Sequence, residues 1–206
     1  MTDRVAGLLL AAGEGSRLGR PKALVEFRGG TLAARGVATL RQAGADPVLV
    51  VTGAAPLHLD GTHTVHNPLW ATGMGSSLKA GLAALSAQSN ATAVVITLAD
   101  QPLVTAATIQ RLIDAHEQGA AVAVAAYHGK PRNPVLLARE HWAEVAALAD
   151  GDTGARPFLR ANPGLVTLVE CADTGRPDDI DTQADLDRLL REDAPGVRDL
   201  GPRVED

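Results

Sequence analysis

The stretch VAGLLLAAGEGSRLGRPK (residues 5–22) joins an uninterrupted apolar run to a glycine-rich loop. The run, residues 5–12, carries no polar side chain, which is typical of a strand buried on both faces of a parallel sheet. The loop that follows contains Gly13, Gly15 and Gly19. Because glycine lacks a Cβ atom, backbone N–H groups in such a loop can approach an anion closely. The stretch therefore predicts a buried first strand that ends in an anion-binding loop.

Strands and helices alternate along the rest of the chain. Strands are expected at 47–52, 62–66, 93–98, 120–127, 134–137 and 166–169. Helices are expected at 32–43, 76–85, 105–118, 140–148 and 182–191. This alternation predicts an α/β fold with a mainly parallel sheet, in which ligands bind beyond the carboxyl ends of the strands. We expect one domain over residues 1–192 and a flexible tail at 193–206.

The composition argues against several classes of function. Aromatic residues make up only 2% of the chain and its net charge is −5, so neither a base-stacking platform nor a polyanion-binding surface is expected. The single cysteine, Cys171, cannot form an internal disulfide or a cysteine-based zinc site. No apolar run approaches the ~20 residues of a membrane span, and the N-terminal residues do not resemble a secretory signal. We therefore expect a cytoplasmic protein with small soluble ligands and no nucleic-acid or membrane partner.

The glycine loop has the spacing GxGxxxG, a variant of the dinucleotide-binding fingerprint, and lacks the Walker pattern. Dinucleotide sites usually have an acidic residue at the end of the second strand, but that strand ends here at Thr52 and Gly53. Arg17 and Lys22 place positive charge where phosphates would lie. A loop that merely joined a strand to a helix would not need these two cations. The pattern favours a ligand that carries phosphate groups and leaves NADP or a flavin open.

Asp100 lies two residues beyond the end of the expected strand 93–98. A carboxylate at the carboxyl end of a strand is well placed to hold Mg²⁺, which prefers oxygen ligands, although it could also cap the next turn. Ser76 and Ser77 stand where a helix is expected to begin, so their hydroxyls could cap the helix or bind a base. The three neighbouring histidines at 58, 63 and 66 have no acid or cysteine in a zinc-binding spacing.

Five segments together resemble the MobA-like nucleotidyltransferases. They are LAAGEGSRLGRPK (10–22), NPLWATGMGSSLKAGL (67–82), GKPRNPV (129–135), GDTGAR (151–156) and DDIDTQADL (178–186). The LAAG opening is similar to the CTP-using branch, which includes molybdenum cofactor cytidylyltransferase, whereas the GTP-using branch typically has LAGG. The resemblance implies a three-layer Rossmann-like nucleotidyltransferase fold. It also implies Mg²⁺-dependent transfer of CMP from CTP to a phosphorylated cofactor, molybdenum cofactor (molybdopterin) first, with release of pyrophosphate.

The same resemblance implies roles for individual residues. The nucleotide would contact Leu10, Ala11, Ala12, Gly13, Gly15, Arg17, Lys22, Ser76 and Ser77. The metal would be held by Asp100 and Asp181, and catalysis would depend on Lys22, Arg17 and Asp100. The acceptor would contact Arg132, Asn133, Asp152 and Arg156. Simpler roles stay open for two of these groups: Asp152 and Arg156 could form a local ion pair, and Asp181 could be a favourable charge at a helix N-terminus.

Two further functions are compatible with the sequence. One is an NAD(P)H-dependent oxidoreductase on a MobA-like fold, of the nicotine blue oxidoreductase type, because the GxGxxxG spacing would suit NADPH. The other is a non-catalytic chaperone that delivers molybdenum cofactor, in which case a molybdoenzyme or its maturation factor would be the partner. The presence of Lys22, Asp100 and Asp181 together favours nucleotidyl transfer over both alternatives.

Overall fold

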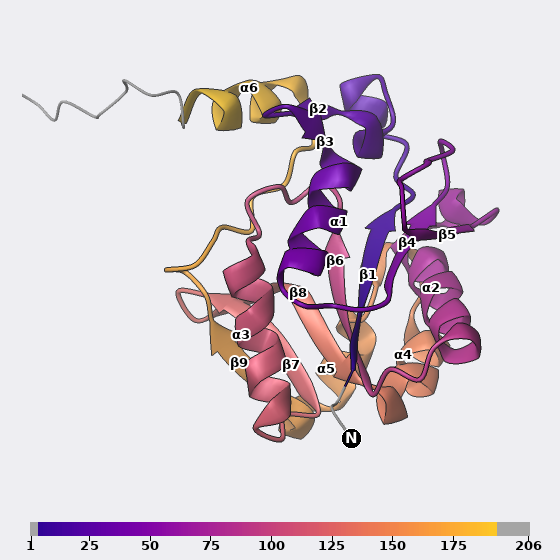
Figure 1. Ribbon diagram of the computed structural model, residues 1–206, viewed down its shortest axis with the longest axis vertical. Helices are drawn as coiled ribbons and strands as arrows, with labels where there is room; N and C mark the ends of the chain where they lie inside the picture. The colour runs from indigo at the N-terminus through magenta and orange to yellow at the C-terminus, as the bar shows by residue number, and fades with distance from the viewer. Residues whose placement is uncertain (1–3, 193–206) are drawn as a thin grey trace, which may run out of the picture.

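A seven-stranded sheet with the strand order β5-β4-β1-β6-β8-β7-β9 forms the centre of the molecule in a computed structural model that describes residues 4–192 (Figure 1). The strands are β1 (Val5–Ala11), β4 (Val48–Thr52), β5 (His63–His66), β6 (Ala93–Leu98), β7 (Val122–Tyr127), β8 (Lys130–Ala138) and β9 (Val166–Glu170). β8 is antiparallel to both of its neighbours, and the other pairs are parallel. The expected mainly parallel sheet is confirmed.

Helices cover both faces of the sheet and make three layers (Figure 1). α1 (Leu32–Gln42) and α3 (Ala106–Glu117) pack on one face, while α2 (Met74–Gln88), α4 (Trp142–Leu148) and α5 (Arg156–Ala161) pack on the other. β1 supplies alternate side chains to the two faces: Leu9 joins the α1 and α3 side, and Leu8 and Leu10 join the α2 side. In register, Leu9 lies between Val50 of β4 and Thr97 of β6. Thr97 therefore faces α1 and α3.

The last helix, α6 (Gln183–Glu192), packs on a small hairpin of β2 (Glu26–Phe27) and β3 (Gly30–Thr31) (Figure 1). A separate apolar cluster joins them: Val25, Phe27, Leu32, Ile180, Leu186 and Leu189. The backbone N–H of Ile180 donates to the carbonyl oxygen of Asp100 at 2.9 Å. This packing brings the chain before α6 to the carboxyl end of β6.

Several elements differ from the sequence-based expectation. α2 begins at Met74 and its N-cap is Gly73, without a side-chain cap, so the prediction that the serines open the helix is wrong. β8 is longer than 134–137, because its proline-containing first half still pairs with β7. The β2–β3 hairpin was missed because each strand has only two residues. Thr105 caps α3, with its hydroxyl accepting from the N–H of Thr108.

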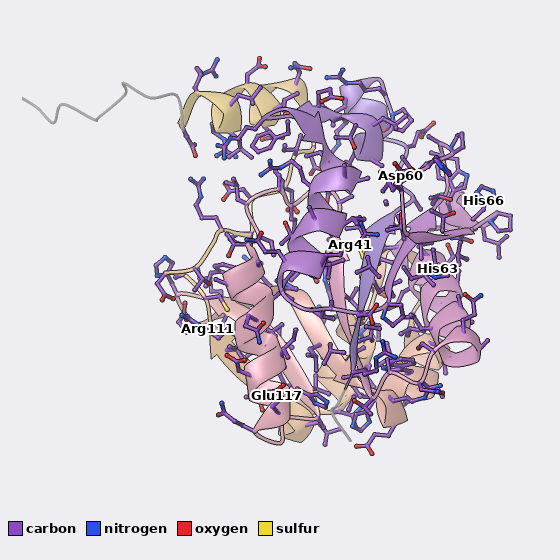
Figure 2. All side chains as sticks on the ribbon, viewed as in Figure 1. Arg41, Asp60, His63, His66, Arg111 and Glu117 are labelled. Carbon is purple, nitrogen blue, oxygen red and sulfur yellow. The ribbon has the colours of Figure 1, made fainter. Side chains whose placement is uncertain are left out.

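The edge strand β5 is short and polar, with His63 and His66 exposed (Figure 2). Arg41 of α1 donates to the carbonyl oxygens of Asp60 and Gly61, which ties the loop before β5 to that helix. Within residues 4–192 no helix is long and apolar enough to cross a membrane. The expected tail at 193–206 lies outside the described residues, and the single domain over 1–192 stays a prediction.

Candidate active site

A cavity of about 430 Å³ opens at the carboxyl ends of β1 and β6. This volume lies in the ordinary range for small-molecule sites. Its lining includes residues 10–17 of the glycine loop and the charged residues Lys22, Asp100 and Asp181. Further lining residues are Trp70, Ala71, Gly73, Met74, Ser77 and Asp152. The position agrees with the expectation that ligands bind beyond the strand ends.

Gly15 determines the shape of the glycine loop. Its φ of 66° lies in the left-handed region, and a Cβ atom there would stand 2.2 Å from the carbonyl oxygen of Arg20. The loop then forms a short 3₁₀ turn, Ser16–Leu18. A Cβ atom at Gly13 would meet no protein atom within 4 Å, so the protein itself does not require glycine at that position. The open space beside Gly13 belongs to the cavity and suits a ligand that approaches the backbone.

The charged centre of the cavity consists of one lysine and two carboxylates. Lys22 Nζ donates to Asp100 Oδ2 at 2.7 Å and also to Asp181 Oδ1. Arg17 Nη2 lies 3.2 Å from Asp181 Oδ2 but is much more exposed. Burial opposes the charge of Lys22, yet the two carboxylates outweigh it and raise its pKa. The hydrogen bond from Lys22 lowers the pKa of Asp181.

Asp100 and Asp181 are therefore close enough for one cation to contact both. Their oxygen atoms are the donors that Mg²⁺ and Mn²⁺ prefer, and Mg²⁺ commonly binds one or two carboxylates together with substrate phosphates. Among the described residues there is no group of three or more His, Cys, Asp or Glu side chains that could hold a metal. The site fits a metal that is bound jointly with a nucleotide and does not fit a fully protein-ligated one.

The two serines of the expected nucleotide site have different environments. Ser77 is buried and lines the cavity. Ser76 is not among the lining residues, and its Oγ lies 2.9 Å from the carbonyl oxygens of both Leu69 and Gly73. Asn67, which sequence reasoning did not single out, donates through Nδ2 to both serine hydroxyls, at 2.8 and 3.0 Å. Ser77 is therefore the serine that lines the cavity.

Trp70 is a second residue that sequence reasoning treated only as part of a motif. It lines the cavity, and a Cβ atom on Gly53 would lie 2.5 Å from its Cβ and 2.8 Å from that of Ala12. Gly53 is thus needed for the close approach of Trp70 to the end of β4. The indole and the methyl group of Ala12 form a compact apolar wall. The sequence signal for this contact was the pairing of a glycine after the second strand with an aromatic in the 67–82 segment.

Of the four residues expected on the acceptor side, only one lines the cavity. Asp152 lines the cavity, and its Oδ1 accepts the backbone N–H of Met74 at 3.3 Å, at the first turn of α2. Arg132 is exposed and donates to the carbonyl oxygen of Pro131. Arg132, Asn133 and Arg156 are absent from the lining of the cavity. Asp152 bonds to Met74 rather than to Arg156.

The fold and the site together define an α/β nucleotide-binding protein with a glycine loop and a two-carboxylate centre at the strand ends. The family model of the MobA-like NTP transferase domain matches residues 7–166. The chain belongs to this family, and the family resemblance drawn from its sequence is confirmed. The assignment places it among nucleotidyltransferases of the MobA-like type.

Three similar proteins illustrate the range of the family. Nicotine blue oxidoreductase of Paenarthrobacter nicotinovorans is 38% identical over 200 residues, which cover 90% of this chain and 96% of that protein. Molybdenum cofactor guanylyltransferase of Xanthomonas euvesicatoria pv. vesicatoria is 39% identical over 108 residues, 52% of each chain. The crystal structure of Rv0371c from Mycobacterium tuberculosis H37Rv matches with a TM-score of 0.78 and 31% identity, over 93% of this chain and 100% of that one. A structure of Rv0371c in complex with manganese matches with a TM-score of 0.72, 30% identity and coverage of 91% and 98%.

Proposed function

We propose that the protein transfers CMP from CTP to a phosphorylated cofactor, molybdenum cofactor first, in a reaction that depends on Mg²⁺ and releases pyrophosphate. The observation that carries this proposal is the meeting of Lys22, Asp100 and Asp181 beside the glycine loop. A triphosphate bound against that loop would lie next to both a cation and the two carboxylates. An oxidoreductase has no evident need for this combination.

The proposed reaction is a displacement at phosphorus. An oxygen of the acceptor phosphate attacks the α-phosphorus of CTP, and the bond from that phosphorus to the bridging oxygen of pyrophosphate breaks. Pyrophosphate leaves with the electron pair, and CMP remains on the acceptor. The acceptor phosphate is already ionised at neutral pH, so the site needs no strong general base. Catalysis then consists mainly of positioning and charge neutralisation.

The residues of the chain divide this work. The backbone N–H groups of the glycine loop hold the triphosphate, and Arg17 and Lys22 offset the charge that builds on the leaving pyrophosphate. Asp100 and Asp181 would hold a Mg²⁺ ion, which would neutralise charge on the phosphates. The similar structure with manganese supports a divalent ion in this fold. Ser77 lies where it can contact the sugar or the base.

We propose CTP rather than GTP as the nucleotide substrate for two reasons. The LAAG opening is similar to the CTP-using branch, and Ala12 adds a methyl group beside Trp70 where a glycine would leave more room. A smaller space for the base suits a pyrimidine better than a purine. The relative named as a guanylyltransferase makes GTP the first competitor to test. Arg132, Asn133 and Arg156 are retained in the proposal as residues that a large acceptor reaches beyond the cavity.

A second candidate function is NAD(P)H-dependent reduction. The relative named nicotine blue oxidoreductase aligns with 90% of the chain and supports it. In that case the glycine loop would bind the phosphates of NADPH, and Lys22 would remain paired with the carboxylates. A third candidate, the molybdenum cofactor chaperone, would bind the cofactor without turnover.

One experiment separates these functions. The protein is incubated with molybdenum cofactor and, in turn, CTP, GTP, ATP or NADPH, with and without Mg²⁺, while pyrophosphate release and NADPH absorbance are followed. Pyrophosphate from CTP that requires Mg²⁺ and is lost in Asp100→Asn supports the proposal. Pyrophosphate from GTP alone overturns the base assignment. If no nucleotide gives pyrophosphate and NADPH is consumed when a quinonoid dye is added, the protein is an oxidoreductase and the proposal is wrong.

A further inference from the structure

A second, much smaller cavity is lined by residues of α1 and α3. These two helices cover the same face of the sheet (Figure 1). It adjoins the nucleotide cavity at the end of β6, where both are lined by Leu98 and Ala99. The centre of a water molecule can occupy a volume of about 10 Å³ inside it. A cavity of about this size has room for one water molecule.

Three buried polar atoms from the lining of this cavity have no hydrogen-bond partner within residues 4–192: Arg35 Nε, Thr97 Oγ1 and Gln101 Oε1. Only five such side-chain atoms occur in that part of the chain, so this cavity gathers most of them. Thr97 and Gln101 are only 5% and 7% exposed. Buried polar atoms in folded proteins nearly always bond to protein or to ordered water. The cavity therefore needs a polar occupant.

The three atoms are complementary to a single water molecule. Arg35 Nε is a donor, Gln101 Oε1 is an acceptor, and the Thr97 hydroxyl can act as either. Buried waters typically make about three such bonds. The orientation of the Gln101 amide is set at its other end, where Nε2 donates to Asp179 Oδ1 at 2.8 Å. Because an ionised carboxylate only accepts, Oε1 is the amide atom that is left for the cavity.

We propose that this cavity binds one water molecule, held by Arg35, Thr97 and Gln101, which fixes Gln101 and through it the segment 178–182. Gln101 follows Asp100 and bonds to Asp179, and the N–H of Ile180 bonds to the carbonyl oxygen of Asp100. These two contacts connect the segment that carries Asp181 to the end of β6. Gln101 is thus a positioning residue for both carboxylates, a consequence that rests on the proposed function.

Two substitutions at Thr97 distinguish the water site from ordinary packing. Thr97→Val keeps the shape of the side chain and removes the hydroxyl, whereas Thr97→Ser keeps the hydroxyl and removes the methyl group. Crystal structures of wild type and both variants are combined with hydrogen–deuterium exchange of residues 178–182, all without metal or nucleotide. We expect an ordered water bonded to all three side chains in wild type and in Thr97→Ser. In Thr97→Val we expect exchange at 178–182 to be roughly three- to tenfold faster, the effect of one net hydrogen bond.

The proposal is overturned if the wild-type cavity holds no water, or if exchange is faster in Thr97→Ser than in Thr97→Val. Gln101→Leu provides an independent variant and is expected to accelerate exchange in the same segment. A Mn²⁺ titration then tests the link to the site: affinity should fall in Thr97→Val and not in Thr97→Ser. Failure of wild type to bind Mn²⁺ would refute the proposed metal ligands, and the exchange data would still decide the water site.

Discussion

Replacing Lys22 by methionine removes the ammonium group that contacts both Asp100 and Asp181. The side chains of Lys22, Asp100 and Asp181 are 19%, 20% and 33% exposed. Removal of one partner from a fully buried ion pair costs about 3–5 kcal/mol, whereas an exposed pair contributes at most about 1 kcal/mol. For this partly buried centre we expect the free energy of unfolding to fall by about 2 kcal/mol at neutral pH.

The pH dependence of this loss follows from the two pKa shifts. The lowered pKa of Asp181 means that its contribution to stability is present above the ordinary aspartate value of about 3.9 and is lost as the pH falls through its folded-state value. The raised pKa of Lys22 means that its contribution is present below 10.5 and is lost as the pH rises through its folded-state value. The difference between wild type and Lys22→Met should be constant between about pH 5 and 9 and shrink toward zero in stronger acid.

Urea unfolding across this pH range, with and without Mn²⁺, measures the effect. Mn²⁺ should restore much of the lost stability in Lys22→Met, because a divalent ion then neutralises both carboxylates. Arg17→Met is the matched control: Arg17 is 68% exposed and contacts Asp181 only at the rim, so a change within about 0.5 kcal/mol is expected. The reasoning is refuted if Lys22→Met is as stable as wild type at neutral pH, or if its loss persists unchanged in acid.

Three further outcomes are expected. Asp100→Asn should abolish Mg²⁺-dependent pyrophosphate release while the circular dichroism spectrum stays that of wild type; residual turnover with the same metal dependence would exclude Asp100 as a ligand. Gly15→Ala should lower the free energy of unfolding, measured with urea, by at least about 1 kcal/mol, because residue 15 has a positive φ and the new Cβ atom would clash with the Arg20 carbonyl. Gly13→Ala should leave the free energy of unfolding unchanged and weaken only nucleotide binding, measured by CTP titration. Cys171 should resist thiol reagents in the native protein and react once urea unfolds it, since burial raises its pKa and encloses the thiol; labelling of the folded protein would contradict this.

The core of the site was predictable because its signals are local. The run before Gly13 is typical of a strand buried on both faces, and the loop after it carries its glycines and cations within ten residues. Asp100 was recognisable for the same reason, since it lies two residues beyond a buried strand. The family resemblance rested on these short motifs and the family match confirms it.

Two contacts in the structure were not anticipated from the sequence. Ser76 was expected to cap α2 or to bind a base, yet its hydroxyl lies against the carbonyl oxygens of Leu69 and Gly73, and the helix begins before it. Asp152 bonds to the N–H of Met74, a residue 78 positions away in the chain. The contact between Asp152 and Met74 could not be read from sequence spacing, because it depends on how two distant segments pack against each other.

The sequence by itself determined the α/β class, the parallel sheet and the glycine loop, because periodicity and turn chemistry act over a few neighbouring residues. Only the tertiary structure decided that Lys22 and Asp181, separated by 159 positions, would meet at Asp100. That meeting depends on α6 packing on the β2–β3 hairpin, whose two-residue strands leave no recognisable pattern. The position of these three charged side chains thus depends on the burial of the apolar cluster between α6 and the hairpin, and such packing is a property of the whole fold.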